Sequence, residues 1–177
     1  MRALVVYESM YGNTHAVAEG IARGMRGGGE AQAVPVAEAT PEAVSAADLL
    51  VVGGPTHMHG MSTERSRRVA IEAAQQPDAV LEEDPDAEGP GLREWFDALT
   101  LPSGIRAAAF DTRLHGPAVV TGRASRGIAK RLERHGATLA APPESFLVGK
   151  DSQLDADEAD RAEAWGATLA GAPAPAL

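Results

Sequence analysis

Two hydrophobic patterns alternate along this chain. Runs dominated by apolar residues, such as residues 3–7 and 48–53, are typical of strands buried on both faces of a parallel sheet. Between such runs, apolar residues recur every three or four positions, which is the spacing of a helix with one buried face. This alternation predicts an α/β protein in which a parallel sheet carries helices on both faces.

The expected elements are five strands with helices between them. Strands are expected at residues 3–7, 31–36, 48–53 and 105–111, with a fifth, interrupted strand region at 138–141 and 145–148. Helices are expected at residues 16–25, 41–47, 65–74, 92–99, 125–135 and 156–170. The predicted fold is a single doubly wound sheet of five parallel strands.

We expect one domain over residues 1–171, because a chain of 177 residues is long enough to bury a core. The Ala- and Pro-rich residues 172–177 are expected to form a flexible tail. Residues 75–91 are polar and contain the acidic run 82–88, which predicts a mobile insertion on the surface. A role for this run in docking a partner remains an alternative to a solvated loop.

The composition of the chain excludes several kinds of ligand and reaction. The chain has no cysteine, so a disulfide, a thiolate nucleophile and a Cys-ligated metal or iron–sulfur cluster are excluded. The net charge of −9 argues against binding to nucleic acid or anionic lipid and suits a basic partner surface. No apolar run approaches the roughly 20 residues that span a bilayer, and no signal peptide is expected, so we expect a cytoplasmic protein without membrane insertion.

A short polar turn follows the first predicted strand and precedes a helix. Backbone N–H groups at a helix start lack intrahelical partners, and the helix dipole favours an anion there. Ser9, Thr14 and Asn13 add side-chain donors, and Gly12 permits a sharp bend. The same residues are also typical of an ordinary helix cap, so a phosphate site and a plain cap both remain possible here.

Two further predicted strands end in segments of unusual composition. The third strand leads into residues 54–61, and the fourth into residues 111–116. In the strand order 2-1-3-4-5, which we expect for this sheet, the first, third and fourth strands are neighbours. Their carboxyl ends would then form one crevice, where ligands bind in doubly wound sheets.

The sequence resembles the flavodoxin family over nearly its whole length. Residues 5–14 (VVYESMYGNT) are similar to the first strand and phosphate loop of that family, whose usual form is (S/T)-x-T-G-x-T. Residues 48–56 (DLLVVGGPT) resemble its third strand and first flavin-flanking loop, and residues 111–113 (DTR) stand where its second flanking loop begins. The resemblance implies an FMN-binding redox protein that transfers electrons through a noncovalently bound flavin.

The resemblance also implies which residues bind the cofactor. The phosphate would be held at Ser9, Met10, Tyr11, Gly12, Asn13 and Thr14. The isoalloxazine ring would lie between Pro55, Thr56, His57, Met58, His59 and Gly60 on one side and Asp111, Thr112, Arg113, His115 and Gly116 on the other. The expected partners are FMN and either a redox protein or an electron donor or acceptor of nicotinamide or quinone type. Whether the protein is an electron carrier or a small oxidoreductase, and its oligomeric state, stay open.

Two departures from the family pattern affect this hypothesis. Tyr11 replaces the small hydroxyl residue that usually precedes the loop glycine. Neither flanking loop offers the Trp or Tyr that commonly stacks on the flavin ring, and imidazole or thioether groups stack less well. We therefore expect weak flavin binding, and the alternative is a flavodoxin-like binding or regulatory module that has lost flavin.

Other chemistry is less well supported. His57 and His59, with His115 from the facing segment, are an alternative metal-ligand set, but no adjacent acidic residue completes it, and we assign no metal. Asp111 and His115 are candidates for acid–base work, although a strand-end Asp often only orients a loop. A serine hydrolase is disfavoured because Ser9 lacks the G-x-S-x-G elbow.

Overall fold

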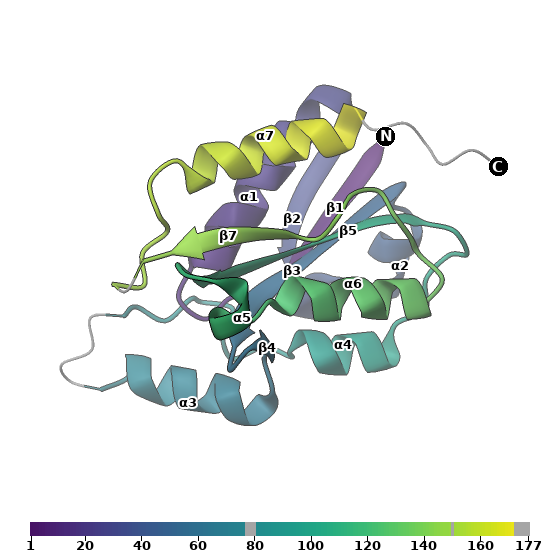
Figure 1. Ribbon diagram of the computed structural model, residues 1–177. Coiled ribbons are helices and arrows are strands. Elements are labelled where there is room, and N and C mark those ends of the chain that lie inside the picture. The colour runs from purple at the N-terminus through teal and green to yellow at the C-terminus, as the bar shows by residue number, and fades with distance from the viewer. Residues whose placement is uncertain (77–80, 150, 172–177) are drawn as a thin grey trace.

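A computed structural model describes residues 1–76, 81–149 and 151–171 of the chain. The predicted tail at 172–177 and part of the predicted insertion, residues 77–80, lie outside the described residues. A twisted sheet forms the centre of the molecule, with helices on either side of it (Figure 1).

The sheet confirms the predicted order. Its main path runs β2-β1-β3-β5-β6, and neighbours on this path pair in parallel. The strands are β1 (Arg2–Tyr7), β2 (Glu30–Pro35), β3 (Leu49–His57), β4 (Gly60–Met61), β5 (Arg106–Leu114), β6 (Thr138–Leu139) and β7 (Glu144–Val148).

The described residues form seven strands where five were predicted, for two reasons. The fifth strand region is split into β6 and β7, which both pair with β5, because Pro142 and Pro143 between them have no N–H for a ladder. The other addition is β4, which turns back and pairs antiparallel with the end of β3. The predicted loop at 54–61 is therefore largely a hairpin.

Helices cover both faces of the sheet. One face carries α1 and α7, and the other carries α2, α4 and α6 (Figure 1). The helices are α1 (Asn13–Met25), α2 (Pro41–Ser45), α3 (Glu64–Ala74), α4 (Leu92–Ala98), α5 (Ala118–Thr121), α6 (Ala124–Arg134) and α7 (Glu158–Gly171), with short 3-10 turns η1 (Arg26–Gly28) and η2 (Val36–Glu38). Among the described residues, no helix is both long and apolar enough to cross a membrane.

The continuous apolar run of β3 is explained by burial on both sides. Leu49 and Val51 pack into the core beneath α1 and α7, whereas Leu50 and Val52 pack into the opposite core. Successive side chains of a strand point to opposite faces, so every position of a central strand must be apolar. The two cores hold the ends of β1, β3 and β5 at one edge of the sheet.

Part of the acidic stretch is buried, contrary to the expectation that it is solvated. Asp84 and Ala87 are buried, and Ala87 packs with Met10 and Ala70 in a small satellite cluster. The Asp84 N–H donates to the Met10 carbonyl at 2.8 Å, which ties the acidic stretch to the turn after β1. Backbone contacts of this kind are independent of side-chain polarity, so composition does not reveal them.

Candidate functional site

Three segments meet at the carboxyl edge of the sheet, as the sequence predicted. In register, Tyr7 of β1 lies beside Gly53 of β3, which lies beside Phe110 of β5, so the segments that follow these strands are neighbours. The hairpin after β3 and the segment after β5 also touch, because His59 forms a backbone bridge with Gly122. A Cβ at Gly122 would lie 2.1 Å from His59 Cα, so this approach requires glycine.

The turn after β1 leaves the start of α1 open. Gly12 adopts the left-handed conformation with φ of 83°, and its N–H donates to Ser9 Oγ at 3.1 Å. Its carbonyl accepts the first helical hydrogen bond, from Ala16 N–H at 2.9 Å. Among the described residues, no side chain caps α1, so the N–H groups of its first turn remain for an anion.

The side chains of this turn fasten it to its surroundings. The buried Thr14 hydroxyl lies 2.7 Å from that of Thr112, at the end of β5. Asn13 Nδ2 donates to the Ser152 carbonyl at 2.7 Å, and the Tyr11 hydroxyl donates to the carbonyl of Ala70 in α3 at 2.9 Å. Asn13 and Tyr11 therefore donate within the protein, and the uncapped N–H groups of the first turn of α1 are the backbone donors that an anion could use.

The hairpin presents two strained residues at its tip. Met58 and His59 link β3 to β4, and both have positive φ, at 44° and 76°. The Met58 side chain is 90% exposed. Two-residue hairpin loops with positive φ at both positions normally carry Asn-Gly or Asp-Gly, so the backbone here is strained.

Asp111 and Thr56 form a buried polar link behind the hairpin. Asp111 Oδ2 accepts hydrogen bonds from the Ser125 N–H at 2.7 Å and from the Thr56 hydroxyl at 3.2 Å. The Thr56 oxygen in turn accepts a bond from the Ala124 N–H at 2.9 Å. Asp111 is fully buried. It therefore attaches the start of α6 to the strand ends.

The segment after β5 is shaped by Arg113. Its Nη1 donates to the Gly116 carbonyl at 2.7 Å and to the Thr121 hydroxyl at 2.9 Å, which curls the segment back on itself. His115 projects from this segment with a side chain that is 72% exposed, and its Nδ1 lies 3.0 Å from an oxygen of Asp155. Arg113 thus positions the segment, and His115 is its accessible polar group.

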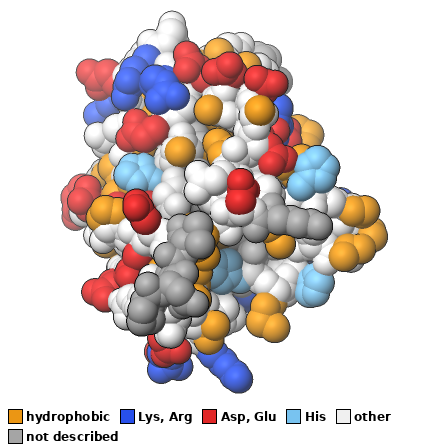
Figure 2. Space-filling model, turned by 90° about the vertical axis from the view of Figure 1, so that its left-hand side faces the viewer, with side chains coloured by type: hydrophobic (Ala, Val, Ile, Leu, Met, Phe, Trp, Pro, Cys, Tyr) orange, Lys and Arg blue, Asp and Glu red, His pale blue; other side chains and the backbone are white. Residues whose placement is uncertain are grey.

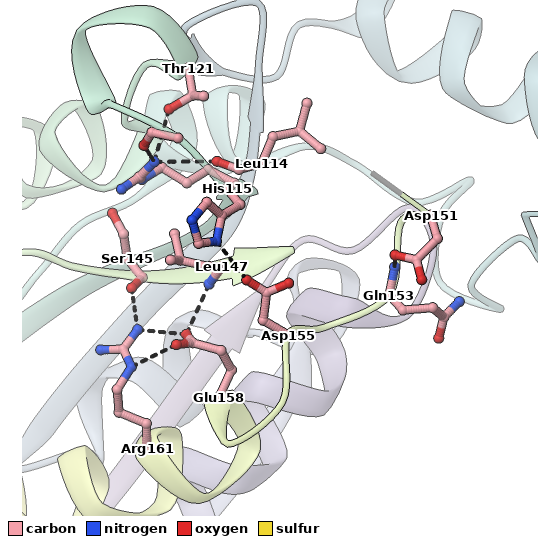
Figure 3. Close-up of polar contacts among 12 residues, drawn as sticks. Leu114, His115, Thr121, Ser145, Leu147, Asp151, Gln153, Asp155, Glu158 and Arg161 are labelled. Atoms are coloured by element: carbon pink, nitrogen blue, oxygen red, sulfur yellow. Dashed lines mark hydrogen bonds and ion pairs between the residues drawn. The ribbon is translucent and has the colours of Figure 1, made fainter. Parts of the chain in front are cut away.

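Asp155 belongs to the segment that follows β7, which is anchored by Glu158 and Arg161. Glu158 Oε2 accepts a bond from the Leu147 N–H at 2.9 Å and pairs with Arg161, which also donates to the Ser145 carbonyl (Figure 3). The segment supplies both the Asp155 carboxylate and the Ser152 carbonyl to the site edge. This fourth segment was not among those that the sequence predicted to form the site.

The three histidines considered as metal ligands are not brought together. His57 points toward α3, where its Nδ1 lies 3.2 Å from Ser66 Oγ, while His115 faces Asp155. Burial, with the charge of Arg67 as the second cause, lowers the pKa of His57. Among the described residues, these histidines do not form a metal-ligating group.

A pocket opens between the turn, the hairpin and α3. Its volume is about 600 Å³, and its walls include Tyr11, His57, Met58, Val69 and Ala73. The lining is mostly apolar with a few polar groups, which is the usual character of a small-molecule site.

A group of aromatic, histidine and acidic side chains lies beside the turn and was not predicted from the sequence. Tyr7 stacks on His15 with ring centroids 4.6 Å apart, and its hydroxyl donates to Asp86 Oδ2 at 3.1 Å. Burial is the main cause that raises the pKa of the Tyr7 hydroxyl, followed by the charge of Asp86. Figure 2 looks onto this end of the molecule and shows histidine and acidic side chains among hydrophobic ones. The sequence feature that could have indicated this group is the acidic pair Asp84 and Asp86, but both residues were expected to be solvated.

Fold and site together define a doubly wound α/β protein with an uncapped helix start at the switch point of its sheet. A family model described as flavodoxin matches residues 5–93, and the chain belongs to the flavodoxin family. No curated protein matches the chain at a significant level.

Solved structures agree in fold. A flavodoxin from the domain Archaea has 22% sequence identity and a TM-score of 0.66, with 96% of each chain covered. Oxidised flavodoxin 1 from Bacillus cereus has 16% identity and a TM-score of 0.64, with 96% of this chain and 97% of that chain covered. A WrbA-like flavodoxin from Agrobacterium tumefaciens has 20% identity and a TM-score of 0.61, with 96% and 94% covered.

Proposed function

We propose that this chain binds FMN noncovalently and works as a redox protein. The bound flavin would supply the electron-transfer chemistry, and the chain would hold it and control access to it. The proposal is supported by membership of the flavodoxin family and by the convergence of three strand-end segments at one edge of the sheet.

The observation that carries the proposal is the uncapped start of α1 behind Gly12. A phosphate there would accept hydrogen bonds from the N–H groups of the first helical turn and would benefit from the helix dipole. Thr14, Asn13 and Tyr11 would support the phosphate indirectly, by fixing the turn to β5, to the segment after β7 and to α3.

The flavin ring would lie between the hairpin and the segment after β5. Met58 and His59 are the exposed groups on one side, and Leu114 and His115 are those on the other. Thioether and imidazole groups contact an aromatic ring less extensively than indole does, so we expect FMN to bind weakly. The apolar pocket beside Tyr11 and His57 is our candidate for the place where a planar nicotinamide or quinone reaches the flavin.

A second candidate function is a binding or regulatory module without flavin. The observation that favours it is the buried carboxylate of Asp84 next to the turn. A Cβ built on Gly12 would lie only 3.9 Å from Asp84 Oδ2, and a negative charge at that position opposes a phosphate.

Flavin titration distinguishes the two functions. Purified protein is titrated with FMN and with riboflavin while flavin fluorescence is followed. Under the proposed function, both flavins bind and FMN binds more tightly because riboflavin has no phosphate. Absence of binding by either flavin at micromolar protein would support the second candidate. Equal affinities for the two flavins would contradict the phosphate assignment.

A matched pair of glycine variants tests the turn itself. Gly12→Ala and Gly104→Ala each place a side chain at a left-handed residue, with φ of 83° and 71°, and each costs about 1 kcal/mol of stability. Gly104 precedes β5, at the opposite edge of the sheet. We expect Gly12→Ala to reduce FMN affinity about tenfold and riboflavin affinity less, because relaxation of the strained turn redirects its N–H groups. Gly104→Ala should leave both affinities unchanged.

A further inference from the structure

We propose that His15, Asp84 and Asp86 form a binding site for a divalent transition-metal ion. The site lies beside the turn after β1, and the proposal does not rest on flavin binding. It uses none of the histidines of the hairpin or of the segment after β5.

The geometry of the three side chains suits a metal ion. One ligand atom from each residue can be chosen so that all three lie within 4.8 Å of one another. His15 Nδ1 lies 3.4 Å from Asp84 Oδ2. Two nitrogen or oxygen ligands of a tetrahedral Zn²⁺ ion, each about 2.0–2.1 Å from the metal, are separated by about 3.3 Å. The spacing of His15 and Asp84 is therefore already close to that of bound ligands.

Asp84 provides an independent indication of a missing partner. Its side chain is only 1% exposed, and Oδ2, the oxygen that faces His15, has no hydrogen-bond partner among the described residues. A buried carboxylate oxygen without a hydrogen bond is costly, and a bound cation removes that cost. The other oxygen, Oδ1, accepts the Asp86 N–H at 3.0 Å, so the carboxylate is held with Oδ2 directed at His15.

The surrounding structure orients each ligand. His15 is the third residue of α1, and its ring stacks on Tyr7. Asp84 is tied by its backbone N–H to the Met10 carbonyl, and Asp86 accepts the Tyr7 hydroxyl. Hydrogen bonds and packing of this kind fix ligand orientation in metal sites. The His15 side chain is 38% exposed, so a cation can enter from solvent.

The donor set predicts which ions bind. One imidazole nitrogen and two carboxylates suit a borderline first-row cation, and the Irving–Williams order places Zn²⁺ above Mn²⁺ for such ligands. Mg²⁺ prefers oxygen ligands and retains its waters, so it should be the weakest of the three. Three protein ligands leave further coordination positions for water.

Calorimetric titration of the flavin-free protein with Zn²⁺ alone tests the site. We expect one equivalent to bind, with weaker binding of Mn²⁺ and weakest binding of Mg²⁺. Asp84→Asn should reduce Zn²⁺ affinity at least tenfold, because it removes the central carboxylate and keeps the side-chain size. The control is Asp155→Asn, which removes a carboxylate that is also paired with a histidine, at 3.0 Å. This control should leave the Zn²⁺ affinity unchanged.

Two further measurements keep the test decisive if Asp84→Asn folds poorly. Circular dichroism establishes whether each variant is folded, and His15→Gln alters a partly exposed ligand on the surface of α1. Co²⁺ bound to the protein should show visible absorption bands that change in His15→Gln. Equal Zn²⁺ affinity in wild type, His15→Gln and Asp84→Asn would overturn the proposal, as would several weak sites without a one-to-one phase.

Discussion

Among the described residues, several buried carboxylates fix backbone segments around the candidate site. Asp111 holds the Ser125 N–H, Asp84 holds the Asp86 N–H, and Glu8 accepts the Leu92 N–H at 2.8 Å. A carboxylate that accepts backbone hydrogen bonds is stabilised in its buried place and positions the segment that donates them. For Asp111, this arrangement gives a structural reason for an acid at the end of a strand.

Glu8 makes the stability of the protein depend on pH. Burial raises its pKa above the ordinary value of 4.5, and hydrogen bonds and the charge of Arg67 offset this only in part. The folded state favours protonated Glu8. The contribution of this group to the free energy of unfolding is therefore complete at pH values below the pKa of Glu8 in the unfolded state. It is lost as the pH rises through the raised folded pKa.

We expect Glu8→Gln to remove this dependence, because glutamine does not ionise and its oxygen can still accept the Leu92 N–H. The difference in free energy of unfolding, variant minus wild type, should grow with pH above about 4.5 and then level off. Each unit by which the pKa is raised adds about 1.4 kcal/mol. Urea denaturation of both proteins at several pH values measures this difference in free energy of unfolding. A difference that stays constant with pH would show that Glu8 is ionised equally in both states.

Among the secondary-structure elements, the hairpin between β3 and β4 departs most from ordinary local preferences. Its tip places Met58 and His59 in left-handed conformations, although side chains there disfavour that geometry. The tip is nevertheless held, because β3 and β4 pair on either side of it and His59 bridges to Gly122. Strain that the surrounding structure maintains is often found at ligand sites.

Replacing the tip by a favourable pair should stabilise the protein. The double variant Met58→Asn, His59→Gly introduces the Asn-Gly sequence that two-residue hairpin loops prefer. We expect the free energy of unfolding to rise by about 1 kcal/mol, since glycine removes one left-handed side chain and asparagine tolerates the left-handed conformation better than methionine does. Leu114→Asn is the control, because it also replaces an exposed apolar residue by Asn but at a residue without positive φ, and it should give no gain. Loss of stability in the double variant would mean that the two side chains make compensating contacts.

For the whole molecule, the sheet was predictable because its signals are local. Residues 3–7 and 49–52 are apolar at every position, since β1 and β3 are buried on both faces. The cap of α2 is local as well, because Thr40 accepts the Ala43 N–H only three residues away. The alternation of such strands with helices was enough to indicate a doubly wound fold.

The missed features depend on contacts between residues far apart in sequence. Asp84 is buried because its N–H meets the Met10 carbonyl, and an acidic run gives no sign of that contact. The hairpin was missed because Gly54 and Pro55 indicate a loop, although β3 continues through them to His57. His15 comes from α1, whereas Asp84 and Asp86 come from the acidic stretch. Their grouping could be predicted only if the packing of these two segments against each other were known.

The net charge of −9 predicts how flavin binding responds to salt. The proposed phosphate site contains backbone donors, while Asp84 and Asp86 lie close to it, so the field of the protein repels an anionic ligand. Salt screens this repulsion. We therefore expect FMN affinity to rise about threefold between about 20 and 300 mM NaCl, with riboflavin affinity unchanged. The titrations are done with a chelator, so that no cation occupies the His15, Asp84 and Asp86 site. Weaker FMN binding at high salt would instead mean that cationic side chains hold the phosphate, which contradicts a site built from the backbone of the turn.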